Sequence, residues 1–215
     1  MLQSCGPEPA FGRRAYFKEI AMNTRIWLAT AATVLSIGVQ GCTLKTQYLQ
    51  IDPEVKVKES QIGIDKVVGL QISDARADKK LGEVGDPDRK MVDVRVDEDP
   101  SPAIYERVKQ ALTRLGFSVQ PYSNAMDRTL AIEIRTLELQ SVKRPLTFNT
   151  ELRAEVAAHA ANSTAYYDRQ FNVKTRKEGA APPYEKDSTM LVTTAVSQAL
   201  EDLLADEQLL DLLAR

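Results

Sequence analysis

Cysteine and histidine are the residue types that this chain most lacks. Its 215 residues include two cysteines, Cys5 and Cys42, and a single histidine, His159. A transition-metal site draws its ligands largely from these residue types, and a catalytic triad places a histidine beside its nucleophile. We therefore expect no metal site, no cofactor and no catalytic residues of the Ser-His or Cys-His kind.

An excess of charge of either sign is also absent. The 28 basic and 30 acidic side chains leave a formal net charge of -2. Proteins that bind nucleic acid hold its phosphates with a basic surface, so this balance argues against a nucleic-acid partner. The chain length predicts one folded domain.

One long apolar run is present near the amino terminus, over residues 26–39. The run is short for a membrane span, which needs about 20 apolar residues. It follows Met22 and Arg25, an order typical of a signal peptide. It ends in Val39-Gln40-Gly41-Cys42, which resembles a bacterial lipobox, although Gln40 is bulkier than the usual serine or alanine.

We therefore predict a lipoprotein signal peptide over residues 22–41, cleaved between Gly41 and Cys42. The thiol of Cys42 would carry diacylglycerol and its new amino group an acyl chain, so that Cys42 anchors the chain to a membrane. No disulfide could then form within the mature chain. The alternative interpretations are a secretory signal without lipid and a core helix that ends in Gly-Cys.

Residues 1–21 do not fit a signal peptide, and we interpret them as the product of an upstream start, with Met22 as the true one. Arg13-Arg14 loosely resembles a twin-arginine export signal, but seven residues separate Lys18 from the apolar run. Thr43 follows Cys42 where an aspartate usually retains lipoproteins in the inner membrane. The sequence thus favours the outer membrane, with the protein facing the periplasm.

The remainder divides into a polar segment and a domain. Residues 42–60 contain Pro53 and no sustained period, so we predict a lipid-anchored tether there, in which Val55 and Val57 could form a short edge strand. Residues 61–215 show the periodicities of a single domain. Alternation predicts strands over residues 66–73, 91–97, 128–141, 151–160 and 165–175, and a brief strand over 117–119, with residues 74–90 as a loop.

A change of phase near Arg135 predicts a bulge in the long strand. Apolar stripes predict a helix from Ser101 to Gly116 and another from Asp187 or Ser188, and Asp206 begins a short terminal helix. The predicted fold is α+β, a mostly antiparallel sheet of about five strands with two amphipathic helices packed on one face.

Three charged side chains, Asp74, Arg76 and Asp78, follow the first strand of the predicted domain. They either form a loop that binds a partner or brace the loop by a salt bridge, and both interpretations stay open. Asp86-Pro87-Asp88 is more typical of a turn than of a calcium site, because it supplies too few ligands. The strand phase of His159 places it on the solvent-exposed face.

Several short motifs resemble the YajG family of uncharacterised bacterial lipoproteins. They are the lipobox, the segment Val67-Val68-Gly69-Leu70-Gln71-Ile72-Ser73-Asp74 with Arg76, the Leu81-Gly82 pair, Leu115-Gly116-Phe117, and the closing residues 206–213. The resemblance spans nearly all of residues 22–215. It implies an envelope lipoprotein with an α+β fold, and it implies no activity.

Two functions remain from the sequence. The first is a non-catalytic envelope lipoprotein that binds an envelope protein or peptidoglycan, through an exposed and partly apolar edge or face of its sheet. The alternative is a carboxylate-dependent enzyme that acts on a glycan, which requires two carboxylates in a cleft and at least one displaced pKa.

Overall fold

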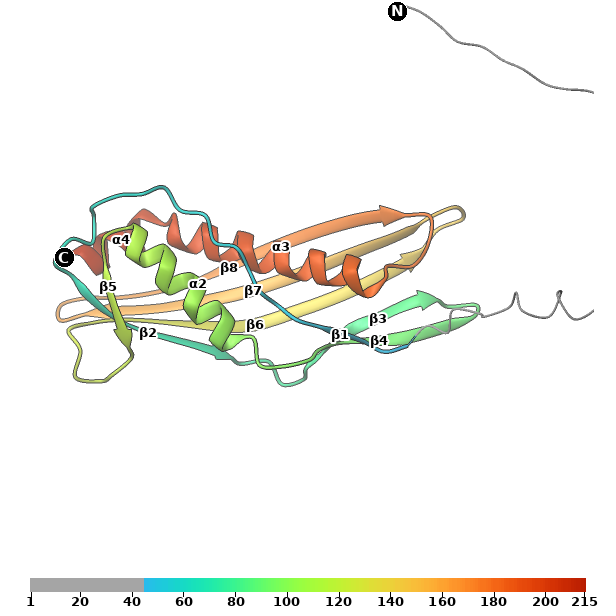
Figure 1. Cartoon of the computed structure of the whole chain (residues 1–215), viewed down its shortest axis with the longest axis horizontal. Coiled ribbons are helices and arrows are strands. Elements are labelled where there is room, and N and C mark those ends of the chain that lie inside the picture. Colours follow the sequence, from blue (N-terminus) through green and yellow to red (C-terminus); the bar gives the residue numbers. More distant parts are fainter. Residues whose placement is uncertain (1–44) are drawn as a thin grey trace, which may run out of the picture. The chain divides into compact units, whose positions relative to one another are not determined.

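The computed structural model describes residues 45–215 of the chain (Figure 1). The predictions for residues 1–21 and 22–41, and for the modification of Cys42, lie outside the described residues. Within the described part there are eight strands and three helices. In chain order they are β1 (Gln47–Leu49), β2 (Val67–Asp74), β3 (Lys80–Asp86), β4 (Lys90–Val96), α2 (Ser101–Arg114), β5 (Ser118–Pro121), β6 (Arg128–Lys143), β7 (Phe148–Asn162), β8 (Tyr166–Gly179), α3 (Glu185–Leu204) and α4 (Glu207–Ala214).

Three long antiparallel strands, β6, β7 and β8, form the centre of the sheet and one of its sides. β7 pairs with β6 along its whole length, from Arg128 opposite Asn162 to Lys143 opposite Phe148. The register shifts between Ile134 and Thr136, so the bulge predicted near Arg135 is confirmed. The bulge turns both Ile134 and Leu137 into the core, although the two residues are three apart.

The other edge of β6 is shared by two shorter strands. β2 pairs in parallel with its first half, over Thr129 to Ile134, and β3 pairs in parallel with its second half, at Leu139 and Gln140. β5 continues the sheet beyond β2 in parallel, whereas β4 and then β1 continue it beyond β3. Because β7 occupies one edge of β6 throughout, β2 and β3 must follow each other end to end along the remaining edge.

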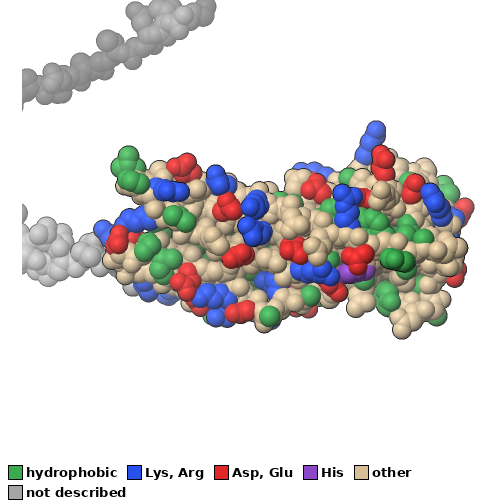
Figure 2. Space-filling model, turned by 180° about the vertical axis from the view of Figure 1, so that it is seen from behind, with side chains coloured by type: hydrophobic (Ala, Val, Ile, Leu, Met, Phe, Trp, Pro, Cys, Tyr) green, Lys and Arg blue, Asp and Glu red, His purple; other side chains and the backbone are tan. Residues whose placement is uncertain are grey.

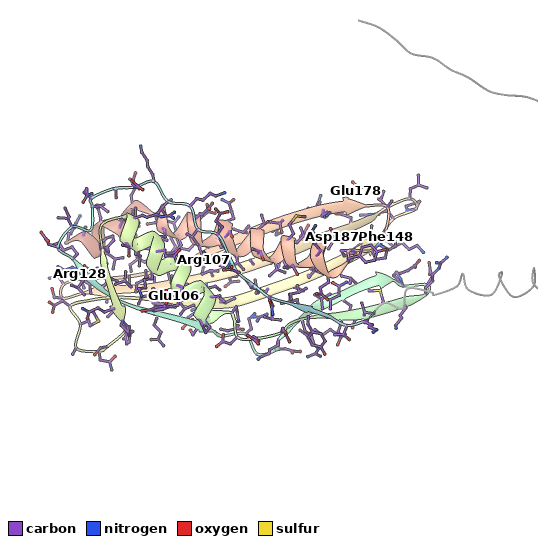
Figure 3. All side chains as sticks on the ribbon, viewed as in Figure 1. Glu106, Arg107, Arg128, Phe148, Glu178 and Asp187 are labelled. Carbon is purple, nitrogen blue, oxygen red and sulfur yellow. The ribbon has the colours of Figure 1, made fainter. Side chains whose placement is uncertain are left out.

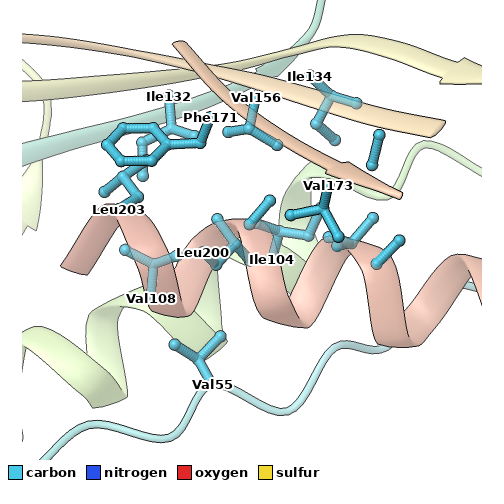
Figure 4. Packing of buried hydrophobic residues seen from close by; sticks show 14 of the residues in the cluster. Val55, Ile104, Val108, Ile132, Ile134, Val156, Phe171, Val173, Leu200 and Leu203 are labelled. Carbon is cyan, nitrogen blue, oxygen red and sulfur yellow. The ribbon is translucent and has the colours of Figure 1, made fainter. Parts of the chain in front are cut away.

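The helices lie on one face of this sheet (Figure 1). α2 packs on β2 and β5, and α3 packs on β7, β8 and β1, while α4 packs on β7 and β8. Their apolar stripes are fully buried, with Ile104 and Val108 from α2 and Leu200 and Leu203 from α3. Figure 4 shows Leu200 and Leu203 directed from α3 towards the sheet. Burial of these stripes stabilises helices that would not form alone.

The α+β class is therefore correct, but the sheet differs from the predicted one. It has eight strands in the described residues rather than about five, and it is mixed rather than mostly antiparallel. The predicted loop over residues 74–90 contains the strand β3. Gly82 and Gly85, both at positive φ, and a register shift between Lys80 and Gly82 disrupt the alternation by which a strand is recognised.

The segment predicted as a tether packs on the domain where the structure describes it. Leu49, Ile51 and Val55 are buried in the hydrophobic core, and β1 forms a parallel pair with β4. Gln47 is also buried: its Nε2 donates to the carbonyl of Pro183 at 2.9 Å, and its Oε1 accepts from Ser188 Oγ at 2.7 Å. Residues 45–60 thus belong to the folded domain, which begins earlier than the predicted residue 61.

Candidate functional site

The sheet face opposite the helices is polar and charged (Figure 2). His159 lies there on β7, with Nδ1 2.8 Å from Asp168 Oδ2 on β8 and Nε2 3.2 Å from Arg135 Nη2 on β6. Glu133 Oε2 lies 3.5 Å from the same Nε2. Both ring nitrogens are therefore engaged by neighbouring strands, and the cluster joins three strands rather than presenting a free base.

Asp74 and Arg76 form a two-point ion pair at the end of β2. Arg76 Nε donates to Asp74 Oδ1 at 2.8 Å, and Nη2 donates to Oδ2 at 2.6 Å. The side chain of Arg76 is only 5% exposed and that of Asp74 14%. A largely buried two-point pair holds the backbone between its members in place, so the geometry favours the bracing interpretation of the sequence pattern.

Asp78, the third residue of the predicted binding loop, lies apart from this pair on the surface. Its Oδ1 accepts from the backbone N–H of Lys80 at 2.9 Å and lies 3.9 Å from Arg95 Nη1. Its side chain is 67% exposed. The structure thus joins two of the three predicted residues to each other and leaves Asp78 accessible.

The acidic Asp86-Pro87-Asp88 segment forms the turn between β3 and β4. Lys143 Nζ from β6 lies 2.7 Å from Asp86 Oδ1 and 2.7 Å from Asp88 Oδ2. This ammonium group holds the pKa of Asp86 below its usual value. Across residues 45–215 no group of three or more histidine, cysteine or acidic side chains is arranged to hold a metal ion.

One groove of about 540 Å³ lies where residues 56–62 pass the end of α2 and the α3–α4 junction. Its apolar lining comes from Val57, Ile62, Leu115, Leu204 and Leu210, and its charged rim includes Lys56, Lys58, Glu59 and Glu201. The rim is partly engaged, because the backbone N–H of Lys56 donates to Glu201 Oε1 at 2.9 Å. The sequence pattern did not predict this groove, because residues 42–60 have the composition of a tether. The alternation of Val55 and Val57 with lysines was the one available indication.

Among the described residues, every carboxyl group whose pKa departs from its usual value has a lowered pKa, so its anionic form is stabilised. Arg107 lowers the pKa of Asp52, Lys80 that of Asp93, and Lys177 that of Asp187. Arg176 likewise lowers the pKa of Glu151, and the backbone N–H of Ser101 lowers that of Asp99. A general acid for glycoside cleavage needs a raised pKa, so none of these displaced groups fits that role.

No helix within the described residues is long and apolar enough to span a bilayer. The described fold has a counterpart among crystal structures: a Xanthomonas campestris protein of a family named DUF330 superposes with a TM-score of 0.52 at 14% identity, over 77% of this chain and 95% of that one. At this identity the likeness shows the fold alone.

Weaker similarities are found to rare lipoprotein B from Shewanella oneidensis and to an uncharacterised lipoprotein B from Nitrosomonas europaea. Their TM-scores are 0.34 and 0.36, at 8% and 10% identity. The first covers 64% of this chain and 87% of its own, and the second covers 69% and 86%. A comparison with curated protein sequences found no match.

The sequence comparison with protein families gives a match that covers most of the domain. A family described as uncharacterised lipoprotein matches residues 53–214, from the segment before β2 to the last residue of α4. This range contains the Asp74–Arg76 pair, the groove and the three helices of the described residues. The chain therefore belongs to this family of uncharacterised lipoproteins, of the YajG type that its short motifs resemble.

Proposed function

We propose that this chain is a non-catalytic cell-envelope lipoprotein, anchored through acyl chains on Cys42 to the outer membrane, and that its periplasmic domain binds a protein or cell-wall partner. The observation that carries the proposal is the family match. A lipoprotein family matches from residue 53 onward, which is eleven residues after the cysteine of the lipobox.

Two surfaces of the described domain support a role in binding. The groove combines an apolar lining with a charged rim, which is the usual anatomy of a protein interface on a small scale. The loop that ends in Asp78 is held in place by the buried Asp74–Arg76 pair and presents an exposed carboxylate. Such a rigidly supported loop suits the binding of a partner because little order is lost on association.

The enzyme alternative finds less support. Every displaced pKa among the described carboxyl groups is a lowered one, and the cause is a neighbouring cation or a backbone N–H. Acid catalysis on a glycan requires the opposite shift. The family is described as uncharacterised, and its description names no activity.

Expression of the full chain and of a Cys42→Ala variant in a diderm bacterium tests the anchor. Mass spectrometry of the wild-type protein should find an amino-terminal cysteine with three acyl chains, and fractionation should recover the protein with the outer membrane. The variant should lose membrane attachment while its circular dichroism stays that of a folded domain. An intact leader, or a free thiol on Cys42, would refute the proposal.

Photo-crosslinking in intact cells tests the binding role. A crosslinking amino acid in place of Ile62 samples the groove, one in place of Asp78 samples the loop, and one in place of Tyr166 provides a control at an exposed site. A specific partner should crosslink from the groove or the loop and not from the control position. Equal or absent crosslinking at all three positions would count against a partner at these surfaces.

A further inference from the structure

The place where the chain enters the domain is fixed by the register of the sheet. Gln47 pairs with Val94 of β4, Val94 pairs with Gly82 of β3, and Gly82 pairs with Leu139 of β6. Gln47 therefore stands level with Leu139 along the strand direction. Its two side-chain hydrogen bonds to Pro183 and Ser188 hold it there.

The direction of the strands shows which end of the domain lies nearer. β1 is parallel to β4, and β4 starts at the β3–β4 turn, so the chain before Gln47 comes from the side of that turn. β6 is parallel to β3 and therefore ends on the same side, where Lys143 contacts Asp86. We call this the turn end. Figure 3 shows Phe148, Glu178 and Asp187 there, and Arg128 at the opposite end.

Covalent geometry limits how far Cys42 can lie from the domain. Cys42 and Gln47 are five positions apart in the sequence, a span of at most about 18 Å. From the level of Leu139 to Lys143, the last residue of β6, is about 13 Å at 3.3 Å per residue. From Leu139 back to Arg128, the first residue of β6, is about 36 Å by the same rise. If the long strands stand upright on the membrane that holds Cys42, the turn end can therefore touch that membrane. The opposite end of the domain cannot.

The turn end carries apolar side chains at its tip. The β6–β7 turn is closed by a hydrogen bond from Arg144 N to Thr147 O at 2.7 Å, and it presents Leu146 with 88% of its surface exposed. Val142 and Tyr184, at 49% and 61% exposed, lie close to the ends of β6 and α3. An aliphatic side chain at the apex of a rigid hairpin is suited to the interfacial region of a bilayer.

We propose that the domain stands end-on on the bilayer that carries the acyl chains of Cys42, with Leu146 inserted into the lipid surface. The inference rests on the proposed function, because it needs the lipid on Cys42. The lipid holds the domain within a few ångströms of the surface, and the insertion of Leu146 then fixes its orientation. The groove and the Asp74–Asp78 loop remain available to a partner in the periplasm.

Single tryptophans test this orientation. The sequence contains one tryptophan, Trp27, within the predicted signal peptide, so Leu146→Trp and Tyr166→Trp each give the mature chain a single reporter. Tyr166 is the matched control for Leu146. Both residues lie at hairpin turns and are 87% and 88% exposed, but they lie at opposite ends of the domain. The lipidated full-length protein is reconstituted into phosphatidylethanolamine–phosphatidylglycerol vesicles with and without brominated acyl chains.

The Leu146→Trp emission should shift to shorter wavelength and be quenched by the brominated lipid, whereas the Tyr166→Trp emission should do neither. With Val142→Trp as reporter, Leu146→Asp should lower the ratio of docked to undocked domain by at least about tenfold, because a leucine leaves the apolar phase. If the lipidated protein shows quenching at neither turn, the proposed docking is refuted, whereas the lipid anchor on Cys42 is not. Quenching at both turns would show a domain lying on its side and overturn the end-on orientation. A protein without lipid would overturn the proposed function and this inference with it.

Discussion

Replacement of Gln47 by alanine tests whether the amino-terminal segment is part of the fold. The side chain of Gln47 is 4% exposed and that of Ser188 is fully buried. Gln47→Ala removes one hydrogen bond to the carbonyl of Pro183 and one from the hydroxyl of Ser188. Both partners would then be buried without a hydrogen bond, and each unsatisfied group would destabilise the fold by about 1–3 kcal/mol before the structure relaxes.

We therefore expect Gln47→Ala to lower the free energy of unfolding by about 2–4 kcal/mol, and to lower Tm by roughly 10 °C for a domain of this size. Urea unfolding followed by far-ultraviolet circular dichroism at pH 7 measures the change. Tyr48→Ala is the matched control, since it alters the adjacent residue of the same strand, where the side chain is 53% exposed. Its effect should stay within about 0.5 kcal/mol.

A double-mutant cycle with Ser188→Ala isolates the interaction itself. The two changes remove the same hydrogen bond, so the effect of the double variant should fall short of the sum of the single variants by about 0.5–3 kcal/mol. A Gln47→Ala protein as stable as the wild type would refute the reasoning. It would mean that the two side-chain hydrogen bonds of Gln47 contribute nothing to the stability of the fold.

Three further changes have defined outcomes. Gly82→Ala would drive a Cβ into the backbone carbonyl of Leu139, which β-sheet pairing holds in place. We expect this overpacking to cost about 2 kcal/mol in urea unfolding. Asp206→Ala removes the side-chain cap from two backbone amides at the start of α4, and this loss should cost about 1–2 kcal/mol in the same assay. Lys177 lowers the pKa of Asp187 below its usual value, so their pairing stabilises the fold at neutral pH and is lost as the pH falls through the lowered pKa. Lys177→Met should raise the titration midpoint of Asp187 in carboxyl NMR, and an unchanged midpoint would contradict the pairing.

The features that the sequence predicts correctly depend on local chemistry. Asp206 begins α4 because its carboxylate accepts from the N–H groups of Gln208 and Leu209, two and three residues further on, as a helix cap requires. The bulge near Arg135 is visible because the apolar residues change phase within one strand. In each case the residues that determine the feature are close neighbours in the chain.

The missed features depend on pairing between distant segments. β1 has three residues and is held by Val94 and its neighbours in β4, far along the chain. β3 contains two glycines at positive φ and joins β6 only through Gly82 and Glu83. Parallel pairs of this kind leave little trace in local periodicity, because their register is set by residues that the pattern does not contain.

The candidate site divides in the same way. Asp74 and Arg76 are two residues apart on the chain, and their mutual salt bridge is one of the two interpretations that the sequence offers. The groove is assembled from residues 56–62, Leu115 and residues 201–210, and no spacing rule joins these three segments. Its existence follows from the packing of the amino-terminal segment on the helices, which the sequence pattern did not predict.

The shared edge of β6 divides the sheet into parts of unequal cohesion. The strands β3, β4 and β1 join the rest of the sheet through two residue pairs, Gly82 with Leu139 and Glu83 with Gln140, and through the Lys143–Asp86 ion pair, whereas β6, β7 and β8 are paired along fourteen or more residues. Few backbone hydrogen bonds cross this seam, so the three-stranded part opens at a lower free energy than the long hairpins, although Leu49, Val84 and Val94 hold it in the core. Its amide hydrogens should exchange with solvent well before those of the long hairpins, and such partial opening would also release the amino-terminal segment from the interior.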